Sequence, residues 1–399
     1  MNPDRRRWLR QLAAAGSWPV VALEGHSTPA PATPIDLAVN TGIGPATGLV
    51  GAAGSDAAGD ITSDTVRRGR SLVFPRDHGA HLGTRTEWWY ATGWLGEPAA
   101  PVLGFQVTFF RSRTGLGAGN PSRFAPRQLL FAHAAVTALA AQRHLHDERI
   151  LRWSGAPDSL TGRAATTDAD VHIGAWRLQR ETGVWRVAVP ARDFSLTLQL
   201  APSQPLLLQG DTGFSRKGPQ EAQSSHYYSL PQLAASGRAL AAGMTVSSPG
   251  RAWLDHEWSQ TILHPEAVGW DWVGMNLFDG GALTVFVLRR QDGSVLWAGG
   301  SYRASGAAGA SFAPTQVQMT PGRRWRSPGS NAAYPVQWQL DTPAGRHTVH
   351  ALMDAQELDS RASTGTIYWE GLSELLDVRG QRIGLGYLEM TGYAAPLRL

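Results

Sequence analysis

The chain has 399 residues, of which 42% are hydrophobic and 17% charged, and its 45 glycines and 25 prolines indicate a globular protein rich in turns. No stretch approaches the roughly 20 consecutive apolar residues of a membrane-spanning helix, and the lack of cysteine excludes disulfide scaffolds, thiolate metal sites and cysteine nucleophiles. The net charge of +4 is scattered, with Lys217 the only lysine among 36 basic residues, so the chain lacks the clustered footprint of nucleic-acid binding.

The N-terminal segment carries the pattern of an export signal. Arginines at 5–7 precede Trp8 and Leu9, as in twin-arginine signals, and a small-residue cleavage site at 30–32 follows a weakly apolar stretch. We therefore expect residues 1–32 to be a signal that delivers the protein to the periplasm or secretes it. A cytoplasmic tail is the alternative.

The segment that follows predicts a linker. Residues 33–69 are dominated by Gly, Ala, Pro, Ser, Thr and Asp, with few large apolar side chains to offset the entropy of ordering the chain. We expect a disordered linker here.

From about residue 70 onward, hydrophobic residues recur with period two. The runs 103–109, 194–200, 283–287 and 336–340 alternate large apolar side chains with smaller or polar ones, between turn residues. Residues 129–139 also fit a helix, but their alternation favours a strand. Many short strands at this spacing predict an all-β protein built from antiparallel barrels or sandwiches.

An internal sequence repeat predicts two similar units. The aromatic segment 87–90 leads through a Gly-Pro turn into an apolar strand, and the segment 270–272 later leads through Asp-Gly-Gly into another. We expect two packed antiparallel β-barrel domains, at residues 70–245 and 246–399. Chance similarity between two aromatic hairpins is the alternative.

Several familiar catalytic motifs are absent, including the serine-hydrolase elbow, the phosphate-binding loop and the dinucleotide fingerprint. The segment starting His256-Glu257 approaches the zinc-protease motif, but Gln260 replaces its second histidine. The spacing of residues 77–81 would suit a metal, although loop hydrogen bonding explains it better. We therefore predict no metal and no cofactor.

The densest group of titratable residues lies at 253–258, where Asp255, His256 and Glu257 stand between tryptophans. Burial favours the neutral form of a carboxyl group, and a neighbouring like charge raises one pKa further. On a strand, Asp255 and Glu257 would share one face, and His256 would point to the other. The pair could supply an acid and a base. A buried polar network that sets strand register is the alternative.

Other polar groups beside aromatic residues extend the candidate site. We expect the carboxyl groups of Asp255, Glu257, Glu87 and Glu370, with His256, to converge on one aromatic cavity. The ligand-binding candidates are Glu87, Trp88, Tyr90, His226, Tyr228, Trp258, Trp270, Trp272 and Glu370.

These motifs together resemble the AttH-like, lipocalin-like proteins related to carotenoid 1,2-hydratase. The resemblance spans roughly residues 70–395 and is carried by segments 74–78, 86–93, 225–229, 252–259, 269–272 and 368–371. It implies two packed lipocalin-like β-barrel domains in a family that is often exported. Many members are described only as predicted secreted hydrolases.

The resemblance also implies cofactor-free addition of water to a carbon–carbon double bond, with Asp255 or Asp271 as proton donor. In this interpretation positive charge develops against Trp270 and Trp272, and His256 or Glu257 activates water. Export favours an apolar, lipid-like ligand other than a carotenoid. The alternatives are a secreted hydrolase, a non-catalytic envelope carrier, or an accessory binding protein of a transport system.

Overall fold

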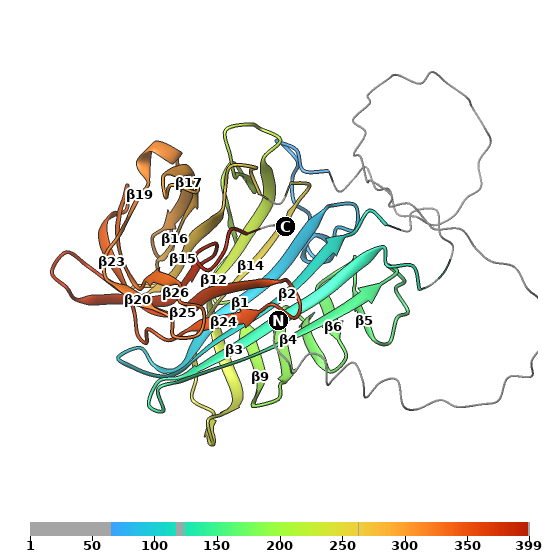
Figure 1. Cartoon of the computed structure of the whole chain (residues 1–399), viewed down its shortest axis with the longest axis horizontal. Helices are drawn as coiled ribbons and strands as arrows, with labels where there is room; N and C mark the ends of the chain where they lie inside the picture. The colour runs from blue at the N-terminus through green and yellow to red at the C-terminus, as the bar shows by residue number, and fades with distance from the viewer. Residues whose placement is uncertain (1–64, 117–121, 123, 262, 398–399) are drawn as a thin grey trace, which may run out of the picture. The chain divides into compact units, whose positions relative to one another are not determined.

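The computed structural model describes residues 65–116, 122, 124–261 and 263–397. In this part of the chain the regular elements are β-strands, apart from single 3-10 turns at η2 (Arg76–His78) and η3 (Pro314–Gln316). The expected signal at 1–32, and residues 33–64 of the expected linker, lie outside the described residues. The all-β class is confirmed, and two antiparallel sheets hold almost all the strands (Figure 1).

The larger sheet is a nearly closed barrel around the first hydrophobic core. Its main path runs β4-β3-β2-β1-β14-β12-β9-β8-β7-β6-β5, while β10, β11 and β13 pair with β12. The two ends of this path meet, because β4 contacts β5 and β6. The strands are β1 (Thr86–Glu97), β2 (Ala100–Arg113), β3 (Gln128–Ala138), β4 (Arg143–Trp153), β5 (Gly162–Ala164), β6 (Asp170–Ile173), β7 (Trp176–Glu181), β8 (Val184–Pro190), β9 (Phe194–Ala201), β10 (Leu207–Leu208), β11 (Phe214–Arg216), β12 (Ser224–Ala241), β13 (Met244–Val246) and β14 (Gly250–Ser259).

The second sheet has ten strands and its own core. Its order is β18-β17-β16-β15-β26-β25-β23-β22-β19, with β24 paired to β25, and β20 and β21 form a separate two-stranded sheet. The strands are β15 (Gly269–Leu277), β16 (Ala282–Arg289), β17 (Val295–Arg303), β18 (Ala310–Phe312), β19 (Gln318–Pro321), β20 (Arg324–Arg326), β21 (Ala333–Pro335), β22 (Gln337–Thr342), β23 (Gly345–Ala351), β24 (Glu357–Ser360), β25 (Thr366–Leu376) and β26 (Arg382–Met390).

Period-two alternation correctly located the strands. In β9, Phe194, Leu196, Leu198 and Leu200 are buried while the residues between them are more exposed, so one face packs on the core. The segment that also suited a helix forms β3, as expected, and most of β3 is buried on both faces.

The aromatic hairpins β1–β2 and β15–β16 occupy the same place in the two sheets. In each case the first strand of the hairpin also pairs with the last strand of its sheet, β14 or β26. Because β14 bonds to β1 and β12, the larger sheet continues past the expected boundary at 245/246. The chain changes sheet between Ser259 and Gly269.

A third apolar cluster joins the two sheets. Tyr90, Trp94 and Trp253 of the larger sheet pack with Trp272 and Tyr387 of the second. These rings bury one face of β1 and β14 that would otherwise face solvent, so the seam between the sheets is an apolar interior.

The last part of the expected linker is held against the larger sheet. The Arg67 backbone N–H donates to His226 Nε2 at 3.4 Å, and Arg68 forms an ion pair with Asp211. In the described part of the chain, no helix is long and apolar enough to cross a membrane.

Candidate functional site

Three adjacent strands, β1, β14 and β12, carry most of the predicted site residues. In their register Tyr90 lies opposite Asp255, and the next pair along is Trp89 and His256. Because successive strand residues point to opposite faces, Asp255 and Glu257 share one face and His256 points to the other. The sequence-based expectation for these three residues agrees with the structure. The two faces of the strands divide the candidate residues into two groups.

The first group lines a cavity of about 360 Å³ between the two sheets, within the size range of small-molecule sites. Both sheets contribute aromatic rings and carboxyl groups to its wall. The residues that carry the argument below are Trp88, Tyr90, Lys217, Tyr227, Asp255, Glu257, Trp270, Trp272, Phe286, Tyr368, Glu370 and Glu389.

Asp255 is the most enclosed carboxyl group of the larger sheet in this cavity, with 3% of its surface exposed. It accepts hydrogen bonds from Tyr227 Oη at 2.7 Å, Ser229 Oγ at 2.5 Å and Trp253 Nε1 at 2.7 Å. Burial raises the pKa of Asp255 to about 7 despite these donors. The group can therefore hold a proton near neutral pH and release it within the cavity.

Glu257, two residues along the same face, has a different environment. Lys217 Nζ lies 3.0 Å from its carboxylate, and Ser225 Oγ also donates to it. The ammonium group stands over the rings of Tyr227 and Phe286, at 4.6 and 4.3 Å from their centroids. Glu257 therefore has a cationic partner that Asp255 lacks, so the two carboxyl groups on this face have different electrostatic environments.

The second sheet supplies two more carboxyl groups. Glu370 on β25 lies directly across from Glu389 on β26, and both line the cavity. Burial and the charge of Glu389 raise the pKa of Glu370 well above its usual range. Burial also raises the pKa of Glu389 to about 7, with further contributions from Asp255, Asp271 and Glu257.

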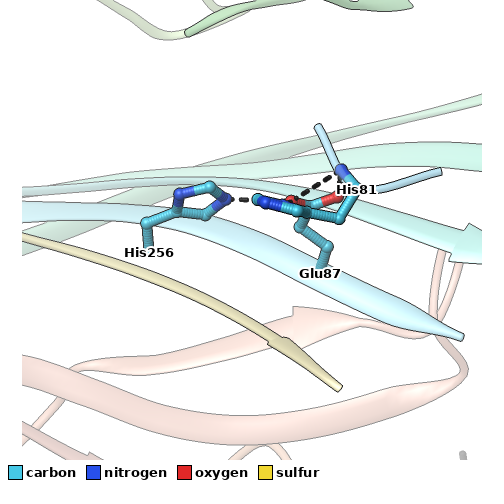
Figure 2. A group of neighbouring side chains, drawn as sticks. All are labelled: His81, Glu87 and His256. Atoms are coloured by element: carbon cyan, nitrogen blue, oxygen red, sulfur yellow. Dashed lines mark hydrogen bonds and ion pairs between the residues drawn. The ribbon is translucent and has the colours of Figure 1, made fainter. Parts of the chain in front are cut away.

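The second group lies on the opposite face of β1 and β14, inside the larger barrel. The imidazole rings of His81 and His256 approach the Glu87 carboxylate at 2.7 and 3.0 Å (Figure 2). Arg111 Nε donates to the other Glu87 oxygen at 2.8 Å, and the second ring nitrogen of His81 lies 3.0 Å from Asp77. Both oxygens of the Glu87 carboxylate therefore have hydrogen-bond partners within the protein.

His81, Glu87 and His256 bring three potential metal-ligand atoms within 4.8 Å of one another. Both ring nitrogens of His81 lie within hydrogen-bond distance of carboxylate oxygens, so neither is left free to bind a metal. The buried Arg111 guanidinium next to Glu87 also repels a cation. Burial alone would raise the pKa of Glu87, but Arg111 and His81 hold it well below its usual range. The cluster fits a self-neutralised ion network better than a metal site.

The remaining candidates lie away from the cavity. His226, Tyr228 and Trp258 share the barrel-side face with Glu87, where Tyr228 Oη lies 3.1 Å from His256 Nδ1 and Trp258 stacks on His81. Asp271 points into the second sheet's interior and pairs with Arg289 at 2.7 Å, and burial raises its pKa to about 6. Asp271 does not line the cavity and so is not positioned to protonate a ligand there.

A protein-family model described as AttH-like matches residues 65–393. The chain belongs to the AttH-like family. A crystal structure of an AttH protein from Nitrosomonas europaea shares 46% sequence identity, covers 82% of this chain and 99% of its own, and has a TM-score of 0.76. The resemblance inferred from the motifs is confirmed.

Kievitone hydratase from Nectria haematococca has the same fold, with a TM-score of 0.61 over 83% of this chain and 96% of its own. Its sequence identity is 14%. Comparison with curated proteins gave no match.

Sequence reasoning missed several residues of the candidate site and of the network behind it. Lys217 was visible as the single lysine of the chain, and Arg111 as a cation that ends an apolar strand, but neither has a local motif. Glu389 is separated from Glu370 by a strand connection, and only their pairing shows that they meet. Convergence on one cavity holds for Asp255, Glu257 and Glu370, whereas Glu87 and His256 occupy the other face.

Proposed function

We propose that the protein binds an apolar, lipid-like ligand in the cavity between its sheets and adds water to a carbon–carbon double bond of that ligand. The observation that carries this proposal is Asp255, a buried carboxyl group with a pKa raised to about 7 that faces an aromatic cavity. Kievitone hydratase, which shares the fold, is described as a hydratase, and this supports the reaction class.

The reaction needs no oxidant or reductant. The Asp255 O–H bond breaks as its proton forms a new C–H bond with one alkene carbon, and the other carbon becomes cationic. Indole and phenol rings such as Trp270, Trp272 and Tyr227 stabilise positive charge through their π-faces. Water then bonds to the cationic carbon and loses a proton to the Glu257 carboxylate, and proton exchange with solvent restores Asp255 and Glu257.

Of the two residues expected to activate water, His256 and Glu257, this assignment selects Glu257. His256 lies on the barrel side of β14, hydrogen-bonded to Glu87 and the Asp77 carbonyl, so its ring does not reach the cavity. Glu257 lines the cavity and lies on the same face as Asp255.

The test uses water labelled with heavy oxygen. The full-length protein is incubated with an apolar extract of its native cells, and products are examined by mass spectrometry for one incorporated label. We expect labelled alcohols with the wild-type protein and a loss of at least about 100-fold with Asp255→Asn, which keeps the shape but not the acidic proton. Glu374→Gln, outside the cavity on β25, is the matched control.

Two results would contradict the proposal. An apolar molecule that is bound but never labelled by the wild-type protein would support the carrier alternative. A large drop in stability for Asp255→Asn would show that the residue is structural.

We also propose export through the twin-arginine segment, which lies outside the described residues. Changing Arg6 and Arg7 to Lys should retain the precursor in the cytoplasm, because twin-arginine recognition depends on the guanidinium pair. Fractionation of cells that express each form measures this, and unchanged delivery would exclude that route.

A further inference from the structure

The pair formed by Glu370 and Glu389 is unusual for a sheet. The two residues are direct cross-strand neighbours and both face the cavity. When both are ionised, two carboxylates at opposed positions repel each other and destabilise a sheet, and no basic side chain in the described residues forms an ion pair with either group. Fold stability therefore does not explain the pair.

Two buried polar atoms beside this pair lack a hydrogen-bond partner. Glu370 Oε1 and Tyr90 Oη have no hydrogen bond of ordinary geometry in the described part of the chain, although the phenol and the carboxyl group interact closely enough to shift each other's pKa as a weak hydrogen bond would. Glu370 is 2% exposed and Tyr90 6%, and both side chains line the cavity. Buried unsatisfied groups are uncommon in native proteins, and at a cavity wall they indicate a missing polar partner.

The charged groups that line the cavity indicate that the missing polar partner is a cation. Four carboxyl groups face the cavity, and Lys217, which also lines it, is already paired with Glu257. Lys217 itself rests on two aromatic rings, so the walls already accommodate an ammonium group.

We propose that Glu370, Glu389 and Tyr90 form a subsite for the ammonium group of an amphipathic amine in this cavity. A primary ammonium has three N–H donors, which can reach both carboxylates and the phenol oxygen. The rest of the ligand lies against the aromatic wall. This subsite extends the proposed function but needs no turnover, because an amine can bind whether or not Asp255 performs chemistry.

The pH dependence of binding follows from the groups around the pair. An ammonium stabilises the ionised carboxylates, so binding tightens as pH rises through about 7, where Glu389 releases its proton. Other titratable and charged groups surround the pair. Those that line the same cavity are Arg85, Tyr90, His133, Lys217, Tyr227, Asp255, Glu257 and Tyr368. Asp271 on β15 and Tyr387 on β26 lie outside the cavity lining but interact electrostatically with the pair.

The test compares three probes of one skeleton, 4-phenylbutan-1-amine, 4-phenylbutan-1-ol and pentylbenzene, by calorimetry with the full-length protein. At about pH 8.5 the amine should bind at least about tenfold more tightly than the alcohol. This advantage should fall by about tenfold at pH 5.5, where the amine itself stays protonated because alkylammonium groups have a pKa of about 10.4.

Variants of Glu370 and Glu389 test whether these two residues cause the tighter binding of the amine. Glu370→Gln and Glu389→Gln should each remove most of the amine's advantage while leaving alcohol affinity within about threefold. Glu374→Gln removes a carboxylate from the same strand but outside the cavity, and should leave amine binding unchanged. Asp255→Asn should retain amine binding, which separates this subsite from the proposed chemistry.

Three outcomes would overturn the inference. The alcohol could bind as tightly as the amine at both pH values, which would indicate a hydroxyl subsite. The amine could keep its advantage in both glutamine variants, or it could fail to bind the wild-type protein at all. None of these outcomes bears on whether Asp255 transfers a proton.

Discussion

The two faces of strands β1, β12 and β14 use similar residues for different purposes. On the barrel side, Glu87 is surrounded by His81, His256 and Arg111, and its charge is neutralised within the protein. On the cavity side, Asp255 keeps its proton near neutral pH, and Glu370, which lines the same cavity, has an unpartnered oxygen. A closed network of opposite charges stabilises a structure, whereas an open group of like charges is poised for a ligand.

The largest expected effect tests the barrel-side network. Arg111→Met should lower the free energy of unfolding by about 3–5 kcal/mol, because it leaves the Glu87 carboxylate buried without its strongest counter-charge. Denaturant unfolding measures this change. Arg361→Met, which breaks the exposed pair with Asp359, should leave the free energy of unfolding nearly unchanged. Equal losses for the two variants would show that the network is not closed.

The pH dependence of stability should differ in sign between the faces. Asp255 has a pKa raised from 3.8 to about 7 in the folded protein, so the unfolded chain releases this proton first as pH rises. Its contribution to stability is therefore complete below about pH 4 and is lost as pH rises through about 7. Glu87, whose pKa is lowered, contributes above its ordinary value of 4.5 and loses that contribution in acid.

Asp255→Asn isolates the cavity-side part of this dependence. Relative to the wild-type protein, the variant should gain about 1–3 kcal/mol of stability between pH 5 and pH 8. Denaturant unfolding at both pH values measures the difference. A variant whose pH dependence matches that of the wild-type protein would show that Asp255 is ionised in the folded state.

Adjacent tyrosines on β12 offer a matched comparison of the faces. Tyr228→Phe removes a hydroxyl that contacts His78 at 2.6 Å and His256 at 3.1 Å, and should cost about 1–2 kcal/mol of stability. Tyr227→Phe removes a donor to Asp255, so the pKa of Asp255 should rise further. In a pH profile that depends on Asp255, the alkaline limb should therefore shift to higher pH in Tyr227→Phe and stay in place in Tyr228→Phe. A shift in both variants would mean that the faces are coupled.

The smallest expected effect concerns metal. Neither a chelator nor added Zn²⁺ should change the melting temperature by more than about 1 °C, because Glu87 and His81 already use their ligand atoms in hydrogen bonds. A calorimetric scan with stoichiometric Zn²⁺ tests this. Saturable stabilisation that disappears in His81→Gln would show that the cluster is a metal site after all.

Much of the secondary structure followed from the sequence, because side chains alternate along a strand whatever the strand packs against. This rule located β3 and β9 and placed Asp255 and Glu257 opposite His256. The aromatic motifs also identified the family, since they are long and specific.

Only the tertiary structure decided which face became the cavity. Both faces of β14 carry a tryptophan and at least one titratable residue, so alternation alone could not tell a closed network from an open site. The difference depends on partners that are distant in sequence, namely Arg111 on one side and Glu389 on the other. Pairing between strands and packing between sheets brought those charges together, and such long-range contacts leave no local pattern in the chain.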